Sequence, residues 1–345
     1  MTKRKTELSV ASVVFMLLVI FIHVVSECVS GYDTSSIQFA VICSLHRLSS
    51  FVVQGFIFLS GVKLFISMRE DFSLTRFYIS RFTRVVLPYV VIFSLFYIYL
   101  SLRGATEPGV GYYFTELLTG GLVGHFYFVA IICQFYLLMP LWRLLYRRGS
   151  ALLCLTVSLM LMLIFKAYLP EIVRVIFGYE LKLNSRLLTS YLFYFVAGIF
   201  AAKYYDRFAE FLTSKRIQIV SLTAFSGVIN CSLIYVIRRG WYYPTWAENF
   251  HVLYCILAIL CTLSIALKLK DSKLFSSQTI KLIDSASYNV YLIHPMFIFV
   301  IDSLCSLVGI HSLTVRLIIK APFTYVGAIG LCMLYELIKD KIKRK

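Results

Sequence analysis

Long apolar segments recur along the whole chain and constrain its fold more than any other feature. The chain has 345 residues, of which 60% are hydrophobic and only 15% charged, and a soluble domain of this size cannot bury so much apolar surface. The pattern predicts an all-α, polytopic membrane bundle of about ten transmembrane helices, forming one domain over residues 1–345. The predicted helices lie at about residues 8–29, 39–67, 85–102, 121–142, 151–169, 187–205, 216–237, 250–267, 286–308 and 315–338.

Lysine and arginine are unevenly divided between alternate connections of these segments. If the N-terminus is cytoplasmic, the inner connections and tails hold 23 of the 34 basic residues and the outer loops hold eight. Cytoplasmic loops carry the excess of positive charge, so both termini are predicted to be cytoplasmic in a multi-pass cell-membrane protein. The net charge of +17 is spread in small groups, which favours this topology signal over nucleic-acid binding. The inner set includes Lys3, Arg4, Arg69, Arg344 and Lys345, and the outer set includes Arg174, Lys182, Arg316 and Lys320.

The first apolar segment carries an ionisable pair near its far end. His23 and Glu27 are four residues apart and share a helix face, so the carboxylate is predicted to hold the imidazole. Lys5 precedes His23 by eighteen residues, or roughly 27 Å of helix, and lies on the same face. A cation at one membrane surface and a base near the other suit a substrate that threads the membrane. The alternative is a histidine that hydrogen-bonds a neighbouring helix.

Further basic side chains occur at two places in the second and third segments. Arg47 lies about eight residues into the second segment, where a guanidinium must face the bundle or a polar cavity. Arg81 and Arg84 are three residues apart at the inner start of the third segment, just before Pro88. Two guanidinium groups there can bind phosphates, although anionic lipid headgroups are an alternative partner.

Two later segments contribute histidine and tyrosine. His125 is predicted near the outer end of the fourth segment, and His294 near the middle of the ninth. Tyr288, Tyr291 and His294 follow one another at intervals of three residues, so they are predicted to lie along one helix face. No two histidines are three or four residues apart, as the neutral ligands of a zinc site would be, so proton transfer or hydrogen bonding is favoured over a metal site.

The ordered set of motifs resembles acyltransferase family 3, integral membrane proteins that O-acylate extracytoplasmic carbohydrates. The resemblance extends over about residues 5–300 and is carried by the set as a whole. Its elements are VIFIHVV with His23, FVVQGFIFLSG, SRFTRVVLPY, GHFYFVAIICQFYLLMP, YFVAGIF and SYNVYLIHP.

The resemblance implies transfer of an acyl group, often acetyl, from cytoplasmic acyl-CoA to a sugar hydroxyl on the other side of the membrane. It places the family's essential histidine on His23 and its basic pair on Arg81 and Arg84. The chain departs from the family at Ser12, where an arginine is usual eleven residues before the histidine. Arg47 or Lys5 has taken over that role, or the activity is altered or lost.

These features predict a membrane O-acyltransferase that modifies a cell-surface glycan or a lipid-linked sugar. His23 is expected to act as general base, oriented by Glu27. Arg81, Arg84 and Lys5 are expected to bind the CoA phosphates, and Arg47 to stabilise charge on the thioester oxygen. The acceptor or tunnel lining is assigned to His125, Tyr291 and His294. Acyl-CoA is a co-substrate, membrane lipids surround the chain, and no bound cofactor or metal is expected.

Two other classes of protein stay open. A transporter or flippase for a polysaccharide or lipid-linked sugar would also place polar groups in the membrane, but internal repeats are expected there and none is found. A membrane glycosyltransferase would need a carboxylate or a pair of them in the first outer loop, and Asp33 is present there but alone, which counts against this class.

Overall fold

The computed structural model describes residues 5–68, 71–178, 183–273 and 278–343, and these residues form helices without any strand. Contacts divide the chain into two compact units, with the boundary inside one helix. Unit 1 includes the residues up to Phe56 and those from Asp206 onward, and unit 2 includes Ile57–Tyr205. The basic residues Lys3, Arg4, Arg69, Lys182, Arg344 and Lys345 of the topology prediction lie outside the described residues.

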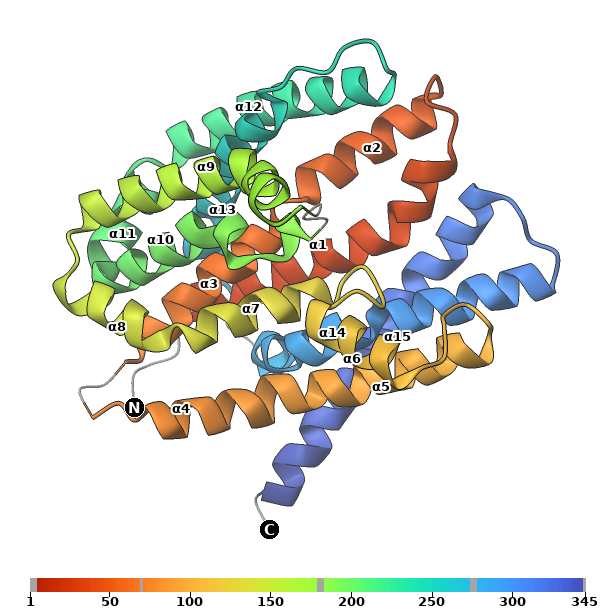
Figure 1. The fold of residues 1–345 in the computed structure, drawn as a ribbon, viewed down its shortest axis with the longest axis horizontal. Coiled ribbons are helices and arrows are strands. Elements are labelled where there is room, and N and C mark those ends of the chain that lie inside the picture. Colours follow the sequence, from red (N-terminus) through yellow and green to blue (C-terminus); the bar gives the residue numbers. More distant parts are fainter. Residues whose placement is uncertain (1–4, 69–70, 179–182, 274–277, 344–345) are drawn as a thin grey trace. The chain divides into compact units, whose positions relative to one another are not determined.

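Figure 1 labels the α-helices of both units. The first three helices are α1 (Thr6–Gly31), α2 (Ile37–Ser49) and α3 (Val52–Ile66), and the unit boundary falls within α3. Unit 2 continues with α4 (Leu74–Arg81), the π-helical turn η1 (Phe82–Val86), α5 (Leu87–Leu102), α6 (Val110–Thr119), α7 (Tyr127–Leu137) and α8 (Met139–Arg148). It ends with α9 (Ala151–Phe177), the 3₁₀ helices η2 (Asn184–Arg186) and η3 (Leu188–Tyr191), and α10 (Leu192–Lys203). Unit 1 resumes with α11 (Tyr205–Ser214), α12 (Arg216–Arg238), α13 (Ala247–Leu269), α14 (Gln278–Leu307) and α15 (Leu313–Lys343).

Each apolar window of the sequence falls on helix. In the described part of the chain, eight helical segments are long and apolar enough to cross a membrane. The bent pair α7 and α8 makes a ninth if it counts as one span, and Leu188–Lys203 is a shorter apolar helix. The all-helical, multi-pass membrane architecture is therefore confirmed, whereas ten spans with two cytoplasmic termini stay a prediction.

Three of the spans are interrupted, each for a local reason. The span Ile37–Ile66 breaks between α2 and α3, where the Ser50 amide bonds the Arg47 carbonyl. The span Leu74–Leu102 contains the π-helical turn η1 directly before α5, whose Pro88 has no N–H to continue the ordinary ladder. The pair α7 and α8 bends by 60° at the start of α8, next to Pro140.

The predicted loops contain more helix than the apolar windows indicated. The segments 103–120 and 206–215 include α6 and α11, whose mixed polar and apolar sequences lack a long apolar run. Arg174 belongs to α9, and Arg316 and Lys320 belong to α15, so assigning these three residues to outer loops was wrong. Charged residues at helix ends lower the local hydropathy and make the predicted helices too short.

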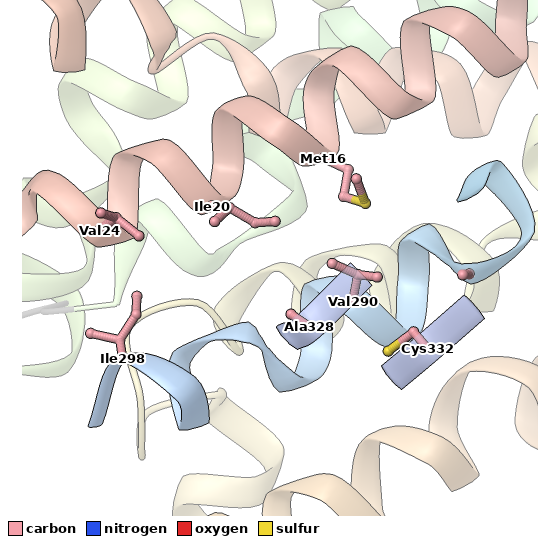
Figure 2. Close-up of a cluster of buried hydrophobic side chains, with 8 residues drawn as sticks. Met16, Ile20, Val24, Val290, Ile298, Ala328 and Cys332 are labelled. Carbon is pink, nitrogen blue, oxygen red and sulfur yellow. The ribbon is translucent and has the colours of Figure 1, made fainter. Parts of the chain in front are cut away.

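The core of unit 1 next to the candidate site is an apolar cluster shared by α1, α14 and α15. Figure 2 shows side chains of these helices meeting, among them Ile20 and Val24 of α1 and Val290 of α14. The whole cluster comprises Met16, Ile20, Val24, Ala286, Val290, Ile298, Ala328 and Cys332, all buried. Burial of this apolar surface fixes the three helices against each other.

Hydrogen bonds fix the direction of α15 relative to α1. The Tyr325 hydroxyl donates to the Leu17 carbonyl at 2.8 Å, and the Tyr32 hydroxyl lies 2.9 Å from Thr314 Oγ1. Residues later in α1 thus meet residues earlier in α15, so the two helices are antiparallel. The start of α1 and the end of α15 consequently face the same end of unit 1.

Unit 2 depends on a close contact between α3 and α10. Gly61 of α3 faces the backbone of Phe195 and Gly198 of α10. On α10, the ring of Phe195 also stacks on that of Phe135 of α7, with centroids 4.4 Å apart. A Cβ atom at Gly61 would lie 2.6 Å from the Phe195 carbonyl oxygen, and one at Gly198 would overlap the Phe58 carbonyl oxygen. The Ser60-Gly61 step in the sequence is therefore a backbone packing point.

Gly198→Val is expected to destabilise the protein by about 1–3 kcal/mol because the new side chain forces the backbones of α3 and α10 apart. Gly330→Val on α15 is the control, since nothing lies within 4 Å of a Cβ atom there. Thermal unfolding of both variants in detergent measures the effect. Equal melting temperatures for the two variants would contradict the packing assignment.

Candidate active site

His23 of α1 lies against His294 of α14. The two imidazole centroids are 5.1 Å apart with an angle of 50° between the rings. His294 is fully buried, whereas His23 is half-buried. The structure therefore brings together two histidines that are 271 positions apart in the sequence and that were predicted separately as base and lining residue.

The hydrogen bonds of His294 fix its tautomer. Its Nδ1 lies 2.9 Å from the carbonyl oxygen of Tyr291 and 3.2 Å from that of Val290. A carbonyl oxygen only accepts, so Nδ1 carries the hydrogen, and in the neutral ring Nε2 holds the lone pair. His294 thus has a basic nitrogen whose identity is set by its own helix backbone.

The predicted face of α14 is confirmed. The rings of Tyr288 and Tyr291 stack with centroids 6.5 Å apart, and Tyr291 lies 6.3 Å from His294. Tyr291 is 7% exposed and His294 is fully buried. An aromatic row therefore leads along α14 to the histidine pair.

Glu27 has partners that its spacing from His23 did not indicate. Its Oε2 accepts a hydrogen bond from Lys320 Nζ of α15 at 2.5 Å, and its Oε1 lies 3.8 Å from the Arg316 guanidinium. Lys320 also lies 3.3 Å from both carboxylate oxygens of Asp302 on α14. The Glu27 carboxylate is thus directed to the cations of α15, one helical turn beyond His23.

Lys320, Asp302 and Arg316 were missed as site residues. Lys320 is only 1% exposed and belongs to a helix long and apolar enough to span a membrane, where an ionisable side chain is by default a functional candidate. One signal was present in the sequence. Arg316 and Lys320 are four residues apart within an apolar window, and Asp302 precedes them in the neighbouring window.

Arg47 of α2 belongs to a second polar network in unit 1. Its Nε donates to Asn230 of α12 at 3.1 Å, and its Nη2 donates to Glu248 of α13 at 3.0 Å. Asn230 is fully buried and its Oδ1 also lies 3.3 Å from Nδ1 of His251. The guanidinium, whose side chain is 14% exposed, is thus paired with a carboxylate within the protein.

The three basic residues predicted to bind CoA lie in different settings. Arg81 ends α4 and is half-buried, with its guanidinium carbon 5.2 Å from the Phe77 ring and 5.4 Å from the Tyr136 ring. Arg84 lies in the π-helical turn and is exposed. Lys5 is exposed at the start of α1. The aromatic rings hold Arg81 in place while leaving part of it accessible.

The remaining predicted residues are more deeply buried. His125 of unit 2 is 1% exposed, and its ring lies 4.0 Å from that of Phe126 and 5.8 Å from that of Phe96. Ser12, where the resemblance implies an arginine, is 4% exposed within α1. An arginine at this position would therefore extend into the interior of the protein.

Asp33 caps the turn between α1 and α2. Its carboxylate accepts hydrogen bonds from the Ser35 amide at 2.9 Å and from the Ser35 hydroxyl at 2.7 Å. These two bonds lower the pKa of Asp33, first through the backbone amide and then through the side chain. Its geometry is that of a turn-forming aspartate.

Taken together, these residues define a polytopic membrane protein with a two-histidine site in its helical core. The first α-helix supplies His23, α14 supplies His294, and charged residues of α14 and α15 lie one to two turns further along. Such a site can accept a proton from a bound hydroxyl group. The charged residues Glu27, Asp302 and Lys320 that pair with one another belong to α1, α14 and α15.

A family model described as an acyltransferase domain matches residues 7–337 of the chain. The chain belongs to this acyltransferase family. Among its curated relatives are the probable poly-beta-1,6-N-acetyl-D-glucosamine export proteins of Staphylococcus aureus strains MW2 and NCTC 8325 / PS 47. Each is 23% identical to this chain over 270 residues, which cover 75% of this chain and 71% of the relative. No solved structure matches the chain.

Arg47→Ala is expected to destabilise the protein by about 1–3 kcal/mol because buried Asn230 loses a charged donor and Glu248 loses its cation. Arg174→Ala is the matched control. It breaks an ion pair with Glu171 in which both side chains are more than half exposed, and such pairs contribute about 0–1 kcal/mol. Thermal unfolding in detergent compares the two. A similar loss from both variants would show that the Arg47 network contributes no more than a surface pair.

Proposed function

We propose that this protein transfers an acyl group from cytoplasmic acyl-CoA to a hydroxyl of an extracytoplasmic glycan or lipid-linked sugar. The observation that carries the proposal is the acyltransferase family match over residues 7–337, which spans both units. The contact of His23 with His294 supports placing the chemistry in unit 1. We propose that the protein lies in the cell membrane, which it crosses ten times with both termini in the cytoplasm. The bias of Lys and Arg between the loops supports this topology, and so does the antiparallel packing of α1 and α15.

His23 acts as the general base in this proposal. The sugar oxygen attacks the thioester carbonyl carbon as its proton passes to the His23 imidazole. The carbon–sulfur bond then breaks, and CoA leaves as the thiol after the imidazole returns the proton. His294 lies against His23 and carries a lone pair on Nε2, so it can serve as a second proton acceptor in the site. Glu27 contributes through its ionic contacts with α15.

The donor is bound at the cytoplasmic ends of the helices. Arg81 is held by Phe77 and Tyr136, which limits the entropy lost when it binds a phosphate, and exposed Arg84 adds a second guanidinium. Lys5, exposed at the start of α1 in unit 1, is a separate candidate cation roughly 27 Å along the helix from His23. Acyl-CoA is a co-substrate, and no bound cofactor is required.

Arg47 takes the role of the arginine that the resemblance places at position 12, where this chain has Ser12. Its Nε and Nη2 are occupied by Asn230 and Glu248, which leaves Nη1 to stabilise the thioester oxygen as charge develops. Tyr291, next to His294 in unit 1, lines the path of the acceptor, and His125 is a separate candidate for the tunnel lining in unit 2. The relatives are named for a polymer of N-acetylglucosamine, so an oligosaccharide of that sugar is the first acceptor to test.

A second candidate is export of a polysaccharide, favoured by the word export in the names of the relatives. A protein that only exports the polysaccharide would consume no acyl-CoA and form no acylated sugar. Formation of an acylated oligosaccharide by the purified protein in detergent separates the two functions.

His23→Ala is expected to lower kcat by roughly 10²–10⁴-fold because the general base is lost. The assay mixes purified protein, labelled acetyl-CoA and an N-acetylglucosamine oligosaccharide, and detects the acetylated sugar by mass spectrometry. Glu171→Gln, on the exposed face of α9, is the control and keeps full activity. Full activity in a well-folded His23→Ala variant would overturn the assignment of the base.

Arg81→Ala combined with Arg84→Ala is expected to raise the KM for acetyl-CoA by roughly tenfold, because charge-assisted contacts with phosphate are removed. The KM for the oligosaccharide should stay unchanged. Arg174→Ala controls for the loss of a surface arginine. An unchanged KM for acetyl-CoA would assign the two arginines to lipid headgroups.

A further inference from the structure

Lys320 joins three helices through two carboxylates. Its ammonium group bonds Glu27 of α1 at 2.5 Å and lies 3.3 Å from both carboxylate oxygens of Asp302 on α14. The lysine side chain is 1% exposed, whereas those of Glu27 and Asp302 are 39% and 25% exposed. The cation is thus enclosed, and the two acids close around it from neighbouring helices.

This arrangement depends on the lysine more than on either acid. A buried ammonium group is retained in an apolar interior only when it is paired, and here two carboxylates pair with it. Removing the lysine leaves the Glu27 and Asp302 carboxylates without the cation between them, while Arg316 stays 3.8 Å from Glu27. The two like charges then repel each other, so α1 and α14 would lose their ionic link and move apart at this level.

The ionic link lies close to the histidine pair. Glu27 follows His23 by four residues, or one helical turn, and Asp302 follows His294 by eight residues, or about two turns. The apolar cluster packs the same helices before and after the histidines, because Val24 directly follows His23 and Ile298 follows His294 by four residues (Figure 2). The cluster contains no residue of α1 beyond Val24 and none of α14 beyond Ile298, and the ionic link joins the two helices beyond these positions.

We propose that Lys320 is a positioning residue for acyl transfer. By tying Glu27 to Asp302 it fixes the ends of α1 and α14 and so holds the His23 ring against the His294 ring. The inference rests on the proposed function, in which His23 takes the proton of the acceptor. Lys320 itself contacts neither substrate.

The kinetic test compares Lys320→Met with Lys320→Arg. Lys320→Met should lower kcat roughly 10- to 100-fold because the reacting groups are misplaced, with the KM for acetyl-CoA unchanged. Lys320→Arg keeps a cation between the two acids and should restore kcat. Lys339→Met is the matched control, since this lysine of the same helix bonds Glu336 within α15. A kcat unchanged by Lys320→Met overturns the proposal.

The structural test measures the spacing of the two helices directly. In a background without native cysteines, Val24→Cys with Ile298→Cys should form a disulfide, and adding Lys320→Met should lower its yield. If Lys320→Met does not accumulate, Asp302→Asn replaces it, because this change removes the ionic attraction between Lys320 and α14 and leaves the Glu27 pair intact. Unchanged kcat and unchanged cross-linking in Asp302→Asn overturn the proposal. Absence of acyl transfer by the unsubstituted protein refutes the proposed function instead.

Discussion

Charged side chains within the membrane-spanning helices must find their partners inside the protein, because the hydrocarbon region offers no water to solvate them. Unit 1 satisfies this constraint twice. Lys320 is enclosed by Glu27 and Asp302, and Arg47 is bonded by Asn230 and Glu248. Each network joins three helices, so the cost of placing a charge in the interior is offset by contacts that also fix the helix positions.

These networks place the candidate base in a defined environment. His23 meets His294 beside the apolar cluster of α1, α14 and α15, one to two helical turns from the acids that bind Lys320. The hydrogen bonds of His294 to its own helix backbone set which nitrogen is basic. General-base catalysis needs this kind of fixed geometry, because a small displacement of the reacting groups lowers the rate strongly.

Much of the fold and part of the site follow from the sequence. The apolar windows locate the helices, the spacing of Tyr288, Tyr291 and His294 predicts their common face, and the depth of Arg47 predicts a neutralising partner. These features depend on local periodicity or on the cost of burying a charge, and both can be assessed from one segment at a time.

The partners themselves depend on tertiary contacts that local spacing does not encode. Glu27 is four residues from His23, which suggested a local pair, yet it bonds Lys320, 293 residues away. Lys320 was counted with the outer loops in the charge analysis, although it lies within the predicted helix 315–338 and belongs to α15. A lysine or arginine near the end of an apolar window is therefore better interpreted as a candidate ion-pair partner of acids on neighbouring helices than as a loop residue.

The central claim is that the protein acylates a glycan and that His23 is essential for this reaction. Mass spectrometry of the cell-surface glycans of a deletion strain, complemented with either the unsubstituted gene or the His23→Ala variant, tests it most directly. The account predicts that the deletion and the variant both lack acyl groups on a glycan present in normal amount, and that the unsubstituted gene restores them. A strain that loses the glycan from its surface while the remaining glycan stays acylated would contradict the account and indicate export.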